Sequence, residues 1–215
     1  MSDKPVIPAY PERGWGQMLP MYFGPEVRVA NHARNGRSSK SFIAEGRWKA
    51  VLEQMKPGDH VIIQFGHNDQ KTADPQRFTA PFGEFKQNLK RYVHETRRQR
   101  GVPILATPVA RRKFGGDGQI KDTHGDYCEA VRQVAAEEQV PLLDMEKRSR
   151  ELLSKMGPEQ SKRLYDWIEL GEFEKCPDGL KDDTHFNAFG ASRMCDLAVL
   201  EIRSAVPELA RRLVW

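Results

Sequence analysis

Short apolar segments of the kind that form buried strands alternate along this chain with longer segments of helical period. The strand-like segments are bounded by Gly, Pro, Asn or Asp, whereas the helix-like segments repeat apolar residues every three or four positions. This alternation predicts an α/β fold in which a parallel sheet carries helices on both faces. The four predicted strands span residues 27–30, 60–65, 102–107 and 140–143.

The helix-like segments fill the intervals between these strands. The clearest places Phe82, Phe85, Leu89 and Val93 on one face of a helix. A further stretch, residues 157–180, is an insertion with a short helix around residues 161–167. The other predicted helices span residues 14–23, 43–55, 122–138, 145–156 and 188–206.

A polar segment, Gln-Phe-Gly-His-Asn-Asp at residues 64–69, begins where the second predicted strand ends. In open α/β sheets, ligands bind beyond the carboxyl ends of the strands, so this segment is well placed for chemistry. Taken alone, it is better explained as a polar turn in which Asn68 and Asp69 bond to their own backbone.

A second polar segment, Lys-Asp-Asp-Thr-His-Phe-Asn at residues 181–187, precedes the last predicted helix. A carboxylate three residues before a histidine can fold back onto the imidazole ring. It then fixes the tautomer and stabilises the imidazolium when the histidine acts as a base. The alternative is that Asp183 or Thr184 caps the following helix, and the two roles can coexist.

Together, these segments resemble two of the four sequence blocks of the SGNH (GDSL-type) hydrolases. The third block, a glycine after the second strand of that fold, is matched by Gly36. The sequences of residues 11–17, 31–41 and 182–191 are similar to those of bacterial rhamnogalacturonan acetylesterases. The resemblance covers essentially the whole chain. It implies a flavodoxin-like three-layer α/β/α SGNH-hydrolase fold, with residues 1–215 as a single domain.

The resemblance also implies roles for individual residues. His185 would be the general base, and Asp182 would orient it, because Asp183 occupies the variable position of the motif. Asn68 and Gly36 would donate hydrogen bonds to the oxyanion, although Gly36 as a plain turn glycine is the alternative. His67 and Asp69 would shape the loop; neither a metal nor a cofactor is implied, since no further His or Cys has ligand spacing.

The first block of the family, Gly-Asp-Ser, carries the nucleophilic serine and has no match in this sequence. We therefore expect an N-terminally truncated chain, with the first central strand, the nucleophile and any export signal encoded upstream of Met1. The rival is that Ser2 is the nucleophile, but a chain-terminal residue is poorly held.

The absent strand predicts consequences for folding and activity. Its neighbours would keep buried backbone groups unpaired, at ~1–3 kcal/mol each. We expect the chain to fold poorly, or to close the gap with its N-terminal segment or another chain, and to be nearly inactive.

Composition and charge limit the partners. The net charge of +4 allows weak attraction to nucleic acid or to a uronic-acid polymer. No nucleic-acid-binding motif is present, and no apolar run approaches the ~18 residues that span a bilayer. Three cysteines without C-x-x-C spacing argue against a disulfide framework or a zinc site. We expect an acetylated polysaccharide as partner, no nucleic acid and no membrane, and an undetermined oligomeric state.

The resemblance implies a carbohydrate esterase that removes acetyl groups from pectic rhamnogalacturonan, with the full-length protein secreted or periplasmic in a bacterium. Trp167 and Tyr165 of the insertion are candidates to line a sugar cleft, and Arg37 and residues 111–113 are candidates to meet galacturonate carboxylates. One alternative is an SGNH esterase that acts on another acetylated glycan such as xylan. Another is a non-catalytic glycan-binding relative that has lost its nucleophile.

Overall fold

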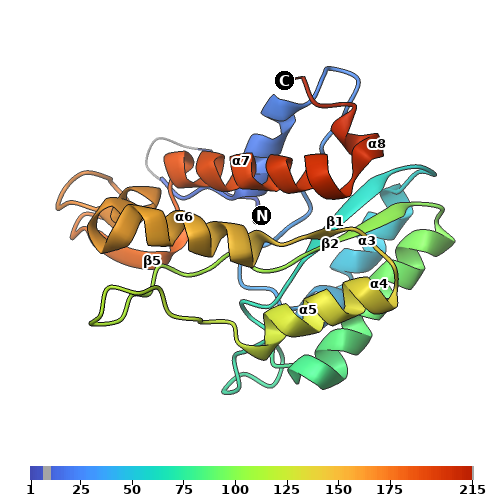
Figure 1. The fold of residues 1–215 in the computed structure, drawn as a ribbon, viewed down its shortest axis with the longest axis horizontal. Helices are drawn as coiled ribbons and strands as arrows, with labels where there is room; N and C mark the ends of the chain where they lie inside the picture. The colour runs from blue at the N-terminus through green and yellow to red at the C-terminus, as the bar shows by residue number, and fades with distance from the viewer. Residues whose placement is uncertain (7–10, 215) are drawn as a thin grey trace.

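A parallel sheet lies between two layers of helices (Figure 1). This computed structural model describes residues 1–6 and 11–214. The sheet has the order β1-β2-β3, and both neighbouring pairs are parallel, which confirms the expected α/β class. Its strands are β1 (His60–Gln64), β2 (Val102–Ala106) and β3 (Leu142–Leu143).

The helices divide between the two faces of the sheet. The short first helix, α1, packs against the long helix α7 on one face, and α4 and α5 cover the other (Figure 1). Within the described residues, no helix is both long enough and apolar enough to cross a membrane. The helices are α1 (Trp15–Met18), η1 (Leu19–Tyr22), α2 (Ser39–Ala44), α3 (Arg47–Gln54), η2 (Pro81–Phe85), α4 (Lys86–Arg98), α5 (Asp126–Glu137), α6 (Met145–Gln160), η3 (Ser161–Leu164), α7 (Ala188–Ala205) and α8 (Pro207–Ala210).

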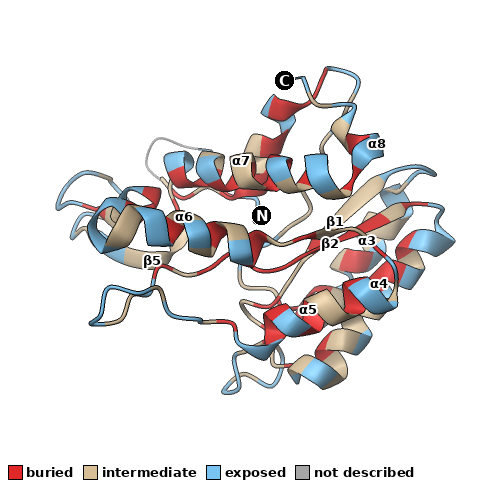
Figure 2. Cartoon of the chain, viewed as in Figure 1, coloured by how far each residue is buried: buried red, intermediate tan, exposed pale blue. Residues whose placement is uncertain are grey.

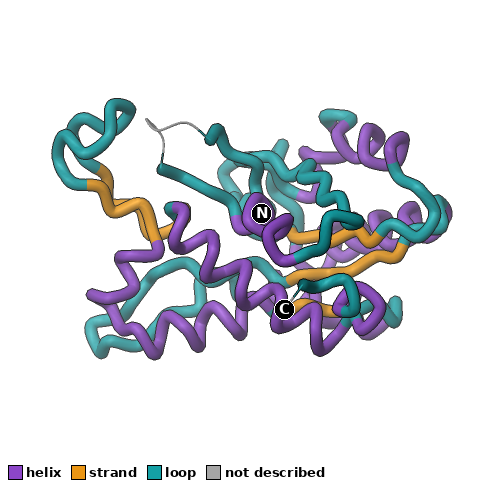
Figure 3. Tube along the Cα trace, turned by 90° about the horizontal axis from the view of Figure 1, so that it is seen from above, coloured by secondary structure: helices purple, strands orange, loops and turns teal. Residues whose placement is uncertain are grey.

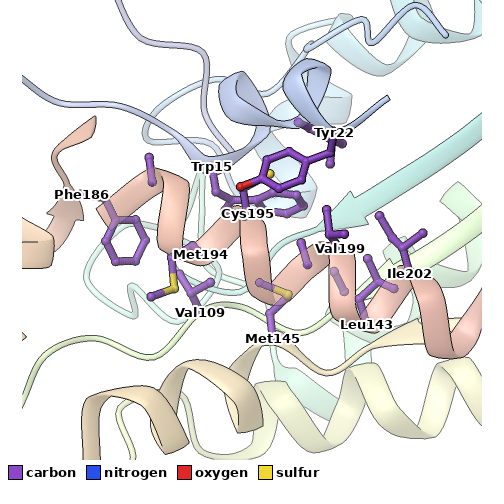
Figure 4. Close-up of a cluster of buried hydrophobic side chains, with 14 of the residues drawn as sticks. Trp15, Tyr22, Val109, Leu143, Met145, Phe186, Met194, Cys195, Val199 and Ile202 are labelled. Atoms are coloured by element: carbon purple, nitrogen blue, oxygen red, sulfur yellow. The ribbon is translucent and has the colours of Figure 1, made fainter. Parts of the chain in front are cut away.

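The core on the α7 side is built from one stripe of that helix. Met194, Cys195 and Ile202 are fully buried against Trp15 of the N-terminal helix (Figures 2 and 4). The start of α7 approaches its neighbour closely: a Cβ added to Gly190 would lie 1.8 Å from a backbone oxygen of η3. Small residues at the helix start therefore fix how α7 sits on the fold.

A second core fills the other face of the sheet. Leu89, Tyr92 and Val93 of α4 are almost completely buried, and they face Val131 and Val134 of α5. Their spacing of three and four positions is the stripe expected of a helix that packs on one side. The apolar side chains that recur every three or four positions in both helices thus pack against the sheet.

One predicted strand does not form. Residues 27–30 are extended but belong to no strand, so the sheet has three strands and not the four that the sequence predicts. A β-branched segment becomes a strand only when a neighbour supplies backbone partners, and this segment is not paired with β1. Residues 27–30 therefore stay outside the parallel sheet.

Several predicted helices have different bounds; the helix predicted over residues 145–156, for example, is α6, which continues to Gln160. The helix predicted over residues 43–55 is two helices, α2 and α3, separated at Gly46, whose φ of +71° is left-handed. The helix predicted from residue 122 begins at Asp126. Asp122 forms a turn before it, accepting the backbone N–H groups of His124 and Gly125. Local hydrogen bonds from a short polar side chain compete with the helix here.

The insertion contains an antiparallel hairpin that the sequence did not reveal. Strands β4 (Tyr165–Ile168) and β5 (Leu180–Phe186) pair outside the main sheet, and the short predicted helix is limited to η3. Figure 3 shows this hairpin and its connecting loop projecting at one end of the molecule. The sequence of β5 is almost entirely polar, so no alternation of apolar residues marks it as a strand.

Candidate active site

His185 and Asp182 face each other near the end of β5. Nδ1 of His185 lies 2.7 Å from Oδ2 of Asp182. The other carboxylate oxygen accepts the backbone N–H groups of Thr184 (2.6 Å) and His185 (2.9 Å). Because an ionised carboxylate only accepts hydrogen bonds, Nδ1 carries the ring proton. One side chain therefore fixes the local turn, the orientation of the ring and its tautomer.

The two side chains shift each other's pKa in opposite directions. Burial pushes the pKa of Asp182 upward, but the hydrogen bonds from the His185 ring and from two backbone N–H groups outweigh it and lower the pKa to about 2. The hydrogen bond to Asp182 raises the pKa of His185 against the opposing effect of burial, and the charge of Glu12 adds to the rise. The pair is arranged to stabilise an imidazolium.

The neighbouring residues 183 and 184 do not cap the helix that follows. Asn187 caps α7, because its Oδ1 accepts the N–H of Gly190 at 2.9 Å. Asp183 instead accepts Nη1 of Arg112 at 2.6 Å and Nε1 of Trp167 at 2.9 Å. The capping alternative is wrong, and Asp183 is engaged on the far side of the strand from Asp182.

Two buried carboxylates lie near the histidine and were missed from the sequence. Oε1 of Glu12 is 3.7 Å from Nε2 of His185, and Glu12 forms a buried ion pair with Lys4. Asp166 is 3 % exposed, and burial, together with the charges of Glu12 and Asp182, raises its pKa to about 7. In the sequence, Glu12 could be recognised only as part of the family-like motif at residues 11–17, and no motif contains Asp166.

Asn68 lies in the loop after β1, beside the loop that carries Gly36. Its Nδ2 donates to the backbone oxygen of Arg37 at 3.2 Å, which ties the two loops together. Gly36 has a φ of +77°, and a Cβ added there would meet nothing within 4 Å. Its left-handed backbone, and not crowding within the protein, is what favours glycine here.

Asp69 connects the loop after β1 with the segment that follows Gly36. Its side chain is fully buried; Oδ1 accepts the N–H of Ser39 (2.9 Å) and the hydroxyl of Thr79 (3.0 Å), and Oδ2 accepts the N–H of Gly66 (3.1 Å). His67 packs edge-on against His124, with ring centroids 4.4 Å apart. Asp69 thus holds the loop through side-chain hydrogen bonds, whereas the His67 side chain contributes a ring contact.

One cavity of about 1420 Å³ brings the predicted site residues together. Its lining includes His185, Asp182, Asn68 and Gly36, from three separate segments of the chain. Among residues 1–6 and 11–214, no hydroxyl lies within hydrogen-bond distance of Nε2 of His185. Ser2 lines the same cavity.

The residues proposed to meet the sugar separate into two groups. Arg37 and Arg111 line the cavity, whereas Arg112 is buried with its guanidinium 4.9 Å from the ring centroid of Trp167. Tyr165 is fully buried, and its hydroxyl donates to the backbone oxygen of residue 110. Neither Tyr165 nor Trp167 lines the cavity, so both serve packing in this structure.

No group of three or more His, Cys, Asp or Glu side chains in the described part of the chain could hold a metal ion. The three cysteines are free thiols, and two of them, Cys128 and Cys195, are buried. Burial raises the pKa of each of these two thiols to about 12, so both are poor nucleophiles.

Comparison with known sequences gives consistent matches over most of the chain. The model of the GDSL-like lipase/acylhydrolase family matches residues 5–193. Rhamnogalacturonan acetylesterase RhgT of Bacillus subtilis is 40% identical over 197 residues, which is 92% of this chain and 83% of the relative. Probable rhamnogalacturonan acetylesterase YesY of the same organism is 37% identical over 190 residues, covering 88% and 83% of the two chains.

Solved structures share the fold. The crystal structure of YxiM from Bacillus subtilis superposes with a TM-score of 0.76 at 28% identity, covering 90% of this chain; the chain spans about half the length of that protein. An acetylxylan esterase from Geobacillus stearothermophilus, Axe2, gives a TM-score of 0.61 at 21% identity and covers 88% of this chain and 81% of its own. At that identity the second likeness concerns the fold alone.

Proposed function

The chain belongs to the GDSL-like lipase/acylhydrolase family, and on that premise we propose that it is a carbohydrate acetylesterase whose substrate is acetylated rhamnogalacturonan. The observation that carries the proposal is the hydrogen-bonded pair of His185 and Asp182 in one cavity with Asn68 and Gly36. The names and identities of the two Bacillus relatives support the choice of substrate.

In the proposed reaction, a serine hydroxyl attacks the acetyl carbonyl carbon while Nε2 of His185 takes its proton. Asp182 holds the ring and stabilises the imidazolium. Collapse of the tetrahedral intermediate breaks the bond to the sugar oxygen, which receives the proton from His185. Water, activated by the same histidine, then releases acetate from the acyl-enzyme.

The oxyanion of both intermediates would accept hydrogen bonds from the backbone N–H of Gly36 and from Nδ2 of Asn68. An amide nitrogen has two protons, so Asn68 keeps a donor beyond the one that it gives to Arg37. Removal of one such donor typically costs ~10²–10³ in rate. Arg37 and Arg111 line the cavity and would attract galacturonate carboxylates, and Nε of Arg37 also donates to the carboxylate of Glu45.

We further propose that a protein consisting of residues 1–215 hydrolyses very little ester. The sequence contains no Gly-Asp-Ser, and in the described residues Nε2 of His185 faces Glu12 at 3.7 Å and not a hydroxyl. The test is acetate release from acetylated rhamnogalacturonan by purified chain 1–215. Release near the background is expected; an ordinary enzymatic rate would refute the proposal, and loss of that rate in Ser2→Ala would identify Ser2 as the nucleophile.

A further inference from the structure

A carboxylate faces each of the two ring nitrogens of His185. Asp182 bonds Nδ1 at 2.7 Å, and Oε1 of Glu12 lies 3.7 Å from Nε2. A separation of 3.7 Å is too long for a hydrogen bond, but it still allows attraction between opposite charges. Glu12 therefore does not occupy Nε2, which can exchange a proton with a reactant, yet its charge favours the protonated ring.

The backbone around Glu12 is fixed relative to the histidine. The N–H of Arg13 donates to the oxygen of Phe186 at 2.8 Å, which joins the residue after Glu12 to the residue after the histidine. Trp15, two positions further on, is fully buried, and its Nε1 donates to Oε1 of Gln64 at 3.1 Å. The place of the carboxylate beside the ring thus follows from backbone and core contacts, and not from a freely rotating surface side chain.

A lysine keeps Glu12 charged although it is buried. Glu12 is 5% exposed and forms an ion pair with Lys4, which is 8% exposed. A buried carboxylate stays ionised only when a positive charge or hydrogen-bond donors stabilise it, and Lys4 supplies that charge. The two members of the pair act on the imidazole in opposite directions, because Glu12 raises the pKa of His185 and Lys4 lowers it. Their effects on the ring can therefore be separated.

The other titratable groups around the ring are uncharged at or below neutral pH. Asp166 has a buried Oδ1 without a hydrogen-bond partner in the described residues, and burial with the charges of Glu12 and Asp182 raises its pKa to about 7. Burial lowers the pKa of His67 well below its ordinary value and that of the Met1 amine to about 5. Within the described part of the chain, the charges that act on the imidazole are thus those of two carboxylates and one lysine.

We propose that Glu12 is a positioning residue of the esterase site, a second carboxylate that acts with Asp182 to stabilise the imidazolium form of His185. The inference rests on the proposed function, in which Nε2 takes the serine proton and passes it to the sugar oxygen. Glu12 neither gives nor receives that proton. Its charge favours the ring that holds the proton between the two steps, and Lys4 limits this effect so that the proton can leave again.

The test is an NMR titration of the His185 ring in chain 1–215. Glu12→Gln removes the charge but keeps the volume and an oxygen that accepts from Lys4. A double variant, Lys4→Met with Glu12→Gln, removes both charges of the pair. Each protein, the reference included, also carries Asp166→Asn, so that this neighbour stays neutral throughout the titration.

The matched control is Glu159→Gln. It neutralises an exposed glutamate that is paired with a lysine, Lys162, as Glu12 is paired with Lys4. This variant should leave the titration of His185 unchanged.

We expect the titration midpoint of His185 to shift to lower pH in Glu12→Gln. In the double variant it should return part of the way, because the repulsion from Lys4 is then gone as well. It should remain below the reference, since Glu12 has the larger effect of the pair. That comparison still decides the matter if an unpaired Lys4 unfolds the single variant.

An unchanged midpoint in Glu12→Gln would overturn the proposal. So would a midpoint that falls further in the double variant than in the single one, because loss of a purely structural ion pair disturbs the ring most when both partners are gone. The titration does not involve acetate release. A failure of the esterase proposal and a failure of this one are therefore recorded separately.

Discussion

At the scale of single residues, the site depends on carboxylates that hold other groups in place. Asp182 orients His185 through a 2.7 Å hydrogen bond, and Asp69 joins the two loops that carry Gly36 and Asn68. Neither carboxylate would touch the reacting atoms. Their contribution is positional, and it can be measured separately from turnover.

The first prediction concerns the pKa of His185 when its partner is neutralised. In Asp182→Asn the pKa of His185 should fall, because the hydrogen bond to the carboxylate is what raises it. A raised histidine pKa contributes stability that is complete below the unfolded value of ~6.5 and is lost as the pH rises through the folded value. Asp182→Asn should therefore cost more stability at pH 6 than at pH 9. The depressed pKa of Asp182 contributes stability above its ordinary value of 3.8 that is lost as the pH falls toward about 2.

The measurement is an NMR titration of the His185 ring, with unfolding curves at the two pH values. Asp178→Asn is the matched control, since Asp178 is an exposed carboxylate in the loop between β4 and β5. A titration curve of His185 that is the same in Asp182→Asn and in the unmodified chain would contradict the proposed electrostatic role of the carboxylate.

The second prediction concerns Asp69. Asn offers one acceptor oxygen, and its N–H₂ cannot accept the N–H of Gly66 or the bonds from Ser39 and Thr79. Asp69→Asn should destabilise the fold by about 2 kcal/mol or more, which lowers the Tm by roughly 4–8 °C for a chain of this size. Thermal unfolding against Asp178→Asn measures the difference; equal Tm values would show that Asp69 does not anchor the loops.

At the scale of elements, the close approach of α7 to η3 sets the position of the hairpin that carries the site. A Cβ at Gly190 would lie 1.8 Å from the oxygen of Leu164, so Gly190→Ala must displace one of the two elements. We expect a loss of at least about 2 kcal/mol in the free energy of unfolding. Gly116→Ala, in an open and exposed loop, should change it by less than ~0.5 kcal/mol. Denaturant unfolding compares the two, and equal effects would mean that this contact does not hold α7 in place.

The sequence predicted those strands and helices whose apolar residues are spaced as their packing against the core requires. The apolar runs of β1 and β2 and the stripes of α4 and α7 were recognised, because burial dictates their composition. The prediction from sequence failed for β5, whose residues are mostly polar because they form the site and not the core. It also failed for residues 27–30, which have a strand-like composition but no neighbouring strand to pair with.

The candidate site was predictable in part for the same reason. His185, Asp182, Asn68 and Gly36 belong to recognisable motifs, and the structure places all four on one cavity. Glu12 and Asp166 are near the histidine only because distant segments meet there, and no local pattern encodes such proximity. The buried roles of Arg112 and Tyr165 likewise follow from tertiary contacts alone.

At the scale of the whole molecule, two cores on opposite faces of a three-stranded sheet meet at one cavity. The missing strand neighbour of β1 and the missing hydroxyl at Nε2 of His185 in the described residues coincide in that cavity. A single added segment that ends beside His185 would therefore supply both. This leads to a prediction for a fusion protein.

The most direct measurement is acetate release by the chain with a short apolar strand followed by Gly-Asp-Ser-Thr fused directly before Met1. We predict release from acetylated rhamnogalacturonan that exceeds release from acetylated xylan. Replacing the added serine by alanine should abolish it, as should His185→Ala, while His94→Ala, an exposed histidine on α4, should leave it intact. A fusion protein that is folded but releases no acetate, or whose release survives His185→Ala, would contradict the assignment of this site as an acetylesterase.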